Sequence, residues 1–196
     1  MTVKITSFIL LTSFYAVYFF KQFSSRNKGI RTNRLAKGSK PKRTRIIEAC
    51  LLISTYVTAG MQYLSVLSSW NIGALPASRA LSAVGLVMMA AGVIFFLLSV
   101  TAMGDNWRAG IDETQKTNIV TSGIYKHSRN PAFAGFDLLY IGSALALPNI
   151  LLIVAVIVSI ALMHLQILEE EKYLPLVFGP EYVEYKKRTP RYLLFF

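Results

Sequence analysis

Five stretches of apolar residues, each bounded by charged or turn-forming positions, dominate the sequence. They cover residues 5–20, 46–67, 80–103, 132–147 and 150–168. At about 1.5 Å per residue, helices of these lengths approach or exceed the ~30 Å apolar core of a bilayer. The pattern predicts an all-α integral membrane protein with about five transmembrane helices, or four if the first run or the last pair is not a span in its own right.

The residues between the runs indicate where the helices end. Lys4 and Lys21 bracket the first run, and their long side chains can reach the two membrane interfaces. No small-residue cleavage site follows that run, so a retained anchor is favoured over a cleaved signal peptide. The turn-forming pair Pro148-Asn149 separates the last two runs, which predicts an antiparallel helical hairpin over 132–168.

Composition agrees with a membrane protein and excludes several other classes. Hydrophobic residues make up 54% of the chain and charged residues only 16%, against about 25% in soluble domains. The single cysteine, Cys50, excludes an internal disulfide framework and a multi-cysteine metal site, and no metal site is predicted. The net charge of +11 is combined with high hydrophobicity, which is not typical of a nucleic-acid binder.

The basic residues are distributed unevenly, and this predicts the topology. Ten Lys and Arg residues and no acid lie in residues 21–45, whereas residues 70–79 carry a single charge, Arg79. By the positive-inside rule, the basic loop 21–45 is cytoplasmic and the N-terminus is outside. The segment 104–130 and the C-terminal tail then lie in the cytoplasm. We interpret the basic loop as a topology determinant that contacts membrane lipids, with no nucleic-acid partner.

Acidic and other chemically active residues gather after residue 104. Glu48 is the only acidic residue before that point. This divides the chain into N-terminal transmembrane helices over 1–103 and a candidate catalytic region over 104–196. Gln166 and Glu170 share one helix face at a spacing of four, and Tyr182 and Tyr185 share a face of a short helix that follows. An interfacial aromatic belt with solvated helix ends is the alternative explanation of this pattern.

Two motifs in the C-terminal half resemble those of a known enzyme family. The first is G-x-Y-x-x-x-R-N-P-x-F-x-G over 123–135, and the second is E-E-x-x-L-x-x-x-F-G-x-x-Y-x-x-Y over 170–185. In this order, on either side of a helical hairpin, they resemble the isoprenylcysteine carboxyl methyltransferase and phospholipid methyltransferase family of integral membrane enzymes. Asn130 and Phe133 depart from the family's usual His and Tyr.

The resemblance implies S-adenosylmethionine as cofactor, S-adenosylhomocysteine as product and a cytoplasmic cofactor pocket formed by the C-terminal half. The acceptor would arrive from the lipid side. Candidate catalytic residues are Arg129, Glu170 and Arg188, and candidate substrate-binding residues are Gln166 and Trp107. Glu170 would bind the cofactor's amino group. The expected cofactor-binding residues are Thr117, Asn118, Ile119, Val120, Tyr125, His127, Asn130, Pro131, Ala132, Phe133, Glu170, Tyr182 and Tyr185.

The identity of the acceptor stays open between chemical classes. A prenylated cysteine carboxylate is favoured and needs no general base, because it is ionised at neutral pH. A phospholipid amine would first lose a proton, to His127 or to a glutamate of the tail. An NADPH-dependent sterol-type reductase is less favoured, since Phe136 rather than Glu follows Gly135. A non-catalytic membrane scaffold is the remaining alternative, and the oligomeric state is not predicted.

A lipophilic acceptor and a water-soluble cofactor together predict a site that opens both to the cytoplasm and sideways to lipid. The fourth apolar run is rich in small residues, which allow close helix approach or an opening on one face. Asp137 in the same run is costly in lipid and is expected to face protein or the cofactor pocket.

Overall fold

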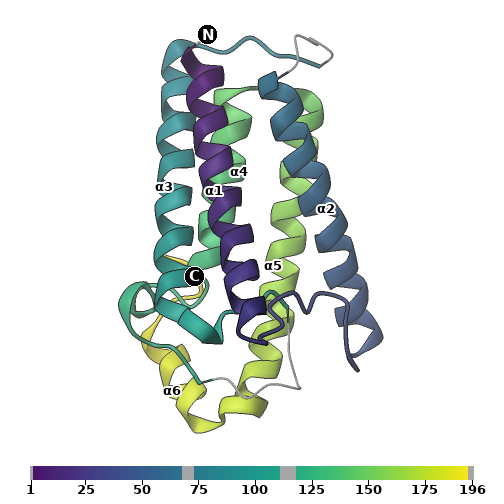
Figure 1. Cartoon of the computed structure of the whole chain (residues 1–196), viewed down its shortest axis with the longest axis vertical. Helices are drawn as coiled ribbons and strands as arrows, with labels where there is room; N and C mark the ends of the chain where they lie inside the picture. Colours follow the sequence, from purple (N-terminus) through teal and green to yellow (C-terminus); the bar gives the residue numbers. More distant parts are fainter. Residues whose placement is uncertain (1, 68–72, 111–117, 194–196) are drawn as a thin grey trace.

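The computed structural model describes residues 2–67, 73–110 and 118–193, and all regular structure within them is helical (Figure 1). The predicted all-α class is therefore confirmed. The elements in chain order are α1 (Thr2–Asn27), α2 (Lys42–Leu67), α3 (Arg79–Met103), η1 (Gly104–Asn106), η2 (Gly123–Lys126), α4 (Pro131–Ala146), α5 (Ile150–Phe178) and α6 (Pro180–Arg188).

Among the described residues, four helices (α1, α2, α3 and α5) are long and apolar enough to cross a membrane. The fourth predicted span forms α4, but its 16 residues make a helix of only about 24 Å. It nevertheless lies beside the long helices for its whole length (Figure 1). The prediction of an integral membrane bundle is confirmed, with α4 the one expected span that falls short of the usual length.

The hairpin predicted from Pro148-Asn149 is present as α4 and α5, which are separated by three residues. The Asn149 side chain begins α5 by accepting hydrogen bonds from the backbone N–H groups of Leu151 and Leu152. These bonds satisfy two backbone N–H groups that have no partner within the helix. α5 then continues for ten residues beyond the apolar run, from Glu169 to Phe178. At 29 residues it is about 44 Å long, so its last turns project beyond a bilayer core.

Four glycines bring α3 and α4 into close contact. A Cβ atom at Gly142 would lie 2.6 Å from the carbonyl oxygen of Gly85, and one at Gly92 would lie 2.7 Å from that of Gly135. Real Cβ atoms do not approach backbone so closely, so any larger residue would separate the helices. The close helix approach expected of the small residues of α4 is therefore confirmed at these glycines, and it closes α4 against α3.

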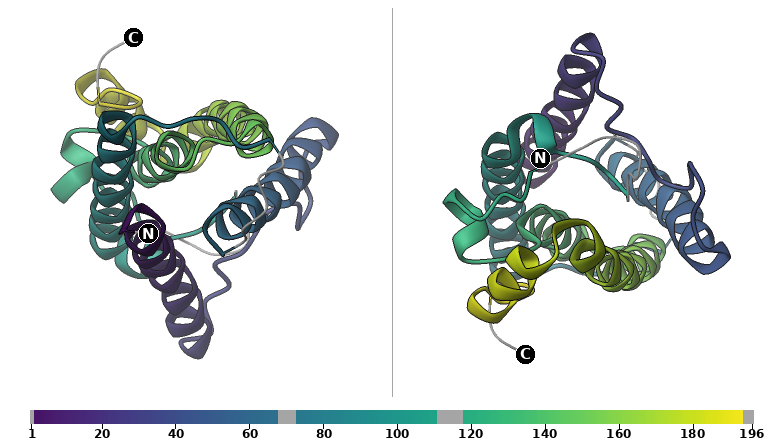
Figure 2. Two further views of the ribbon diagram at one scale, coloured as in Figure 1. Left: turned by 90° about the horizontal axis from the view of Figure 1, so that it is seen from above. Right: turned by 90° about the horizontal axis from the view of Figure 1, so that it is seen from below.

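The other long helices pack in pairs around this contact. Figure 2 shows α1 beside α3 and α2 beside α5, which leaves α1 and α2 facing each other across the bundle. Buried polar contacts join the helices: Thr58 of α2 meets Ser159 of α5 at 2.8 Å. Near mid-bundle, Tyr15 of α1 donates to Gln62 of α2 at 2.7 Å. Hydrogen bonds between helices are favourable where no water competes for the groups.

The basic loop lies at the same end of the bundle as η1, η2 and α6 (Figure 1). Lys28 pairs with Asp105 at 2.9 Å. An isolated bridge joins Asn33 to Ala109, with Arg34 N–H donating to the Ala109 carbonyl at 2.8 Å. The segments predicted to share the cytoplasmic side therefore share one end of the molecule. Their side of the membrane stays a prediction.

Candidate active site

A cavity at the end of the bundle that carries the basic loop is enclosed by α3, η2, α5 and α6. Its volume is about 140 Å³, and we call it the polar cavity because three charged side chains, Glu170, Arg108 and Arg129, stand in an otherwise largely apolar wall. Aromatic rings form much of the remaining wall. Its described lining residues are Met103, Asn106, Arg108, Gly110, Asn118, Ile119, Val120, Tyr125, Arg129, Glu170, Tyr173, Leu174, Val177, Phe178, Tyr182 and Tyr185.

Glu170 is held toward this cavity by Gln166, one helical turn earlier on α5. The Gln166 amide donates to Glu170 at 2.9 Å and to Glu48 of α2 at 3.3 Å. Glu48 is fully buried and pairs with Lys40 at 2.7 Å. A continuous polar chain therefore runs from the basic loop through α2 to the carboxylate that lines the cavity.

The second glutamate of the pair, Glu171, points away from the polar cavity and holds the C-terminal segment. Its carboxylate forms ion pairs with Arg129 and, at 2.9 Å, with Arg191. Arg129 also donates to the backbone carbonyls of Lys186 and Thr189. Because both of its terminal nitrogens are engaged in this way, Arg129 acts as the centre of a structural clasp. These contacts give no support to the expectation that Arg129 is a catalytic residue.

Three of the four tyrosines that line the polar cavity, Tyr125, Tyr182 and Tyr185, come from η2 and α6. The Tyr185 hydroxyl donates to the Tyr125 carbonyl at 2.7 Å, which joins α6 to η2. Burial raises the pKa of Tyr182 to about 12, and burial likewise raises the pKa values of Tyr125 and Tyr185. All three hydroxyls therefore stay protonated at neutral pH. They can donate hydrogen bonds, but they cannot serve as general bases there.

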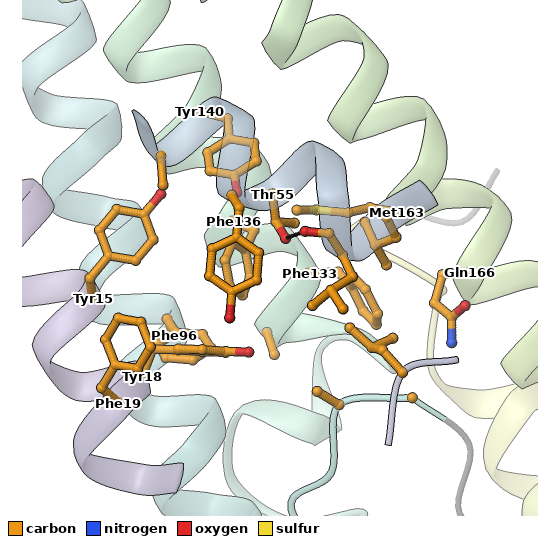
Figure 3. A pocket seen from close by; sticks show the side chains of 18 of the residues that line it. Tyr15, Tyr18, Phe19, Thr55, Phe96, Phe133, Phe136, Tyr140, Met163 and Gln166 are labelled. Atoms are coloured by element: carbon orange, nitrogen blue, oxygen red, sulfur yellow. Dashed lines mark hydrogen bonds between the residues drawn. The ribbon is translucent and has the colours of Figure 1, made fainter. Parts of the chain in front are cut away.

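A second, larger cavity of about 390 Å³ lies inside the bundle, and we call it the apolar cavity. Figure 3 shows aromatic side chains from α1, α3 and α4 converging on it, among them Tyr18, Phe96 and Phe136. α2 supplies the facing wall with Leu51, Thr55 and Tyr63. Its lining at the end near the basic loop includes Leu35, Trp107, Arg108, Ala109, Gly110 and Gln166.

Arg108 and Gly110 line both cavities and so mark their junction. Gly110 has φ +88°, and a Cβ there would lie 2.9 Å from the backbone nitrogen of Leu35. Only glycine combines this left-handed backbone with so close an approach. The junction thus depends on the chain from the basic loop passing directly against residue 110.

The structure separates the residues predicted from the sequence into three groups. Asn118, Ile119, Val120, Tyr125, Glu170, Tyr182 and Tyr185 line the polar cavity, together with Arg129. Ala132, Phe133, Gln166 and Trp107 line the apolar cavity instead. His127, Asn130, Pro131 and Arg188 line neither. Thr117 lies outside the described residues.

The contacts and exposure of the four residues that line neither cavity explain why they do not. Asn130 donates to the Arg191 carbonyl at 3.1 Å and so fixes the C-terminal segment. Pro131 is the first residue of α4, where its missing N–H costs nothing. His127 and Arg188 are exposed. Asp137 lines neither cavity either, but its Oδ1 is buried, so of the two expected surroundings it faces protein rather than the cofactor pocket.

A protein-family model and several curated proteins match this chain in sequence. The family model described as "Phospholipid methyltransferase" matches residues 81–181, just over half of the chain. A protein-S-isoprenylcysteine O-methyltransferase of Xenopus laevis is 30% identical over 118 residues, which are 59% of this chain and 41% of that protein. The B form of Arabidopsis thaliana is 30% identical over 109 residues, 54% of this chain and 55% of that protein.

A relative from Saccharomyces cerevisiae with the same name is 39% identical over 72 residues, 36% of this chain and 30% of that protein. The chain therefore spans about a third to a half of the length of these relatives. The matched region contains α4, α5, both glutamates of the pair and the described walls of the polar cavity except Tyr182 and Tyr185. This chain belongs to the phospholipid methyltransferase family of membrane proteins.

Proposed function

We propose that the protein transfers a methyl group from S-adenosylmethionine to a carboxylate on a lipophilic acceptor, most simply a prenylated cysteine. One observation carries the proposal: a polar cavity and a long apolar cavity meet at Arg108 and Gly110. The two reactants differ in the same way, since one is charged and water-soluble and the other carries a hydrocarbon chain. The names of the relatives support the same chemistry.

The residues of the polar cavity fit the cofactor. Its α-ammonium group requires an anion, and Glu170 lies in the cavity wall with Gln166 as its hydrogen-bonding neighbour. A sulfonium cation is attracted by aromatic faces, and Tyr125, Tyr182 and Tyr185 supply them. The described walls enclose less than the ~300 Å³ typical of ligand sites. Residues 111–117, which connect two of these walls, lie outside the described residues.

When bound, S-adenosylmethionine supplies an electrophilic methyl group on sulfur. The chain's own task is then to hold two groups in line, which is the main requirement of such a displacement. Glu170 holds the ammonium end, and the tyrosines confine the sulfonium region. Trp107, Phe133 and Gln166 border the apolar cavity near the junction, where the acceptor's reacting end would lie.

A carboxylate acceptor suits the site better than an amine does. A carboxylate is ionised at neutral pH and needs no general base. A phospholipid amine would require one, but His127 is exposed and lines neither cavity. Of the tail glutamates, Glu181 and Glu184 are exposed, whereas Glu170 lines the polar cavity and is assigned here to the cofactor's ammonium group. Amine methylation therefore remains the second candidate, with Glu170 as its available base and the description of the family model in its favour.

The polar cavity lies at the end of the bundle with the basic loop, which favours cofactor entry from the cytoplasm. The apolar cavity lies between α1 and α2, so the acceptor's chain would enter from membrane lipid on that side. We therefore propose a multi-pass membrane protein whose active site and C-terminus face the cytoplasm and whose N-terminus lies outside.

Calorimetric titration of the purified protein with S-adenosylhomocysteine, beside a titration with NADPH, tests the cofactor. We expect saturable binding of S-adenosylhomocysteine and none of NADPH, and the reverse would favour a reductase. Incubation with radiolabelled S-adenosylmethionine and either N-acetyl-S-geranylgeranyl-cysteine or phosphatidylethanolamine then tests the acceptor. Label in phosphatidylethanolamine alone would reject the carboxylate.

A further inference from the structure

Lys40 of the basic loop and Glu48 of α2 form a buried ion pair, and neither is among the described residues that line the two cavities. Their side chains are 3% and 0% exposed, and Lys40 Nζ lies 2.7 Å from Glu48 Oε2. Replacement of a buried ion pair by apolar side chains is often neutral for stability, because the desolvation of two charges offsets their attraction. The pair is therefore better explained by the contacts that it fixes than by the stability that it adds.

The Glu48 carboxylate connects the basic loop to α5 through both of its oxygens. Oε2 accepts from the Ala36 backbone N–H at 2.8 Å, and the Lys40 ammonium donates to both oxygens. Oε1 also accepts from the Gln166 amide of α5 at 3.3 Å. Lys40 in turn donates to the Arg34 carbonyl at 2.9 Å. The basic loop, α2 and α5 thus meet at one carboxylate.

The Gln166 amide nitrogen serves two carboxylates, because it donates to Glu170 at 2.9 Å as well as to Glu48. An amide NH₂ group has two hydrogens, and here each has its own acceptor. The terminal torsion of a glutamine side chain has broad minima, so the amide turns easily when one acceptor is lost. Glu48 therefore restricts the orientation of the group that holds Glu170.

The charge of Lys40 adds a second effect. Glu48 and Glu170 accept from one nitrogen, so two carboxylates lie close together at the edge of the polar cavity, where their charges repel each other. The Lys40 ammonium balances the charge of Glu48. Glu170 then carries the net negative charge that a cationic group of a ligand requires.

We propose that Lys40 and Glu48 are positioning residues for Glu170. Through Gln166 they hold the Glu170 carboxylate in place for the ammonium group of the cofactor. Both residues lie outside the matched range 81–181, so the cofactor site then extends into the N-terminal half of the chain. This inference rests on the proposed function, in which Glu170 binds that ammonium group.

The test measures how strongly the protein prefers a ligand that has the ammonium group. S-adenosylhomocysteine and its deaminated analogue, in which hydrogen replaces that group, are titrated by calorimetry, and the ratio of their dissociation constants gives the preference. General damage to the cavity weakens both ligands and cancels in the ratio. The native protein should prefer S-adenosylhomocysteine roughly 10- to 100-fold, as for a charge-assisted hydrogen bond. Equal dissociation constants would overturn this inference but not the proposed cofactor.

Two variants remove the contact between residue 48 and Gln166 in different ways. Lys40→Met combined with Glu48→Leu replaces the ion pair by apolar side chains of similar size and keeps the net charge. Glu48→Asp keeps the charge but is one CH₂ shorter, so it withdraws the acceptor; it decides alone if the double variant does not fold. Each should reduce the ammonium preference about 3- to 10-fold, the cost of immobilising one side chain on binding. An unchanged preference would overturn the proposal.

A matched double variant controls for the loss of an ion pair as such. Lys187→Met combined with Glu184→Leu removes an exposed pair of 2.7 Å on α6 and also keeps the net charge. It should keep the native ammonium preference. A similar reduction in this control would overturn the proposal, because any ion pair near the cavity would then have the same effect.

The ligand-free protein gives a readout that does not depend on the cofactor. Gln166→Leu removes the contact between α5 and Glu48, and tryptic cleavage after exposed Lys37 reports how often the basic loop opens. We expect faster cleavage than in the native protein, whereas Gln62→Leu, which replaces another fully buried glutamine, should leave the rate unchanged. If the native protein binds neither ligand, the proposed function fails, and this measurement still decides the link: an unchanged rate in Gln166→Leu would overturn it.

Discussion

The amide of Gln166 donates a 2.9 Å hydrogen bond to the carboxylate of Glu170, one turn further along α5. Gln166 lines the apolar cavity and Glu170 lines the polar one. One hydrogen bond on a single helix therefore joins the walls of both cavities. A shift of α5 would move both walls together, so in the proposed reaction this helix would set the distance between cofactor and acceptor.

The charge of Glu170 should control cofactor affinity. Glu170→Gln keeps the shape of the side chain but removes the charge that would bind an ammonium group. We expect S-adenosylhomocysteine affinity to fall by about 1.5–3 kcal/mol, or roughly tenfold to a hundredfold, in a calorimetric titration. Lys172→Gln, two residues on and largely exposed, is the control and should bind normally. Equal losses in the two variants would show that the cofactor does not lie at Glu170.

Glu171 should matter for stability more than for cofactor affinity. It is nearly buried and pairs with Arg129, which is itself almost inaccessible. Glu171→Gln leaves that arginine without its counter-charge, and loss of one partner of a buried pair costs about 3–5 kcal/mol. We expect a clearly lower thermal midpoint in detergent and faster proteolysis after residue 186. Glu184→Gln breaks only an exposed pair with Lys187, and an equal effect there would contradict the clasp.

The contact between α3 and α4 should tolerate no added side chain. Gly142→Val places atoms where the backbone of α3 already lies, as a Cβ there would be 2.7 Å from the Met89 nitrogen. Overpacking of this kind costs about 1–3 kcal/mol. We expect less monodisperse protein in size-exclusion chromatography and a lower thermal midpoint. Gly60→Val on α2 meets nothing within 4 Å, and a similar loss there would refute a specific packing effect.

The elements that follow from local sequence were predictable. The apolar runs gave the helices, Pro148-Asn149 gave the hairpin, and the spacing of Tyr182 and Tyr185 gave the buried face of α6. Each depends on helix periodicity or turn chemistry within about ten residues. The structure extends α1 and α5 past their apolar runs, because helix propensity continues through polar residues that a hydrophobicity criterion excludes.

The parts of the site that depend on tertiary contact were not predictable. Arg108 lies in a short irregular segment, and its position follows from the bridge between Asn33 and Ala109, far apart in sequence. Phe133 stands in the motif expected to bind cofactor, but the rotation of α4 turns it into the apolar cavity. No acidic residue stands close to Arg129 in the sequence, and only the fold brings Glu171 to it.

The predicted topology can be tested with two engineered cysteines in a Cys50→Ser background, since Cys50 is exposed. Ser39 lies in the basic loop, and Ala77 lies in the connection before α3; both are exposed. A membrane-impermeant maleimide should label Ala77→Cys on intact cells, and Ser39→Cys only after permeabilisation. Labelling of position 39 on intact cells would reverse the orientation.

The apolar cavity should make methylation depend on the length of the acceptor's chain. Each CH₂ removed from water contributes about 0.8 kcal/mol, so longer chains gather in the membrane near the enzyme. We expect kcat/KM, expressed per total acceptor, to rise through N-acetyl-cysteine derivatives with C5, C10, C15 and C20 chains. A flat series would contradict a role for this cavity.

Enrichment in the membrane alone would also produce that rise, so a variant must separate the two causes. Ala59 of α2 lines the apolar cavity between Thr55 and Tyr63, toward the end remote from Arg108. Ala59→Trp should fill that end and lower kcat/KM for the C20 acceptor by about tenfold while leaving the C10 acceptor nearly unchanged. Val57→Trp adds the same ring on an exposed face of α2 and is the control. Membrane enrichment is identical for both variants, because the lipid is the same. Only a chain long enough to reach residue 59 would meet the new ring. If Ala59→Trp lowers kcat/KM equally for the C10 and C20 acceptors, the acceptor's chain does not occupy this cavity.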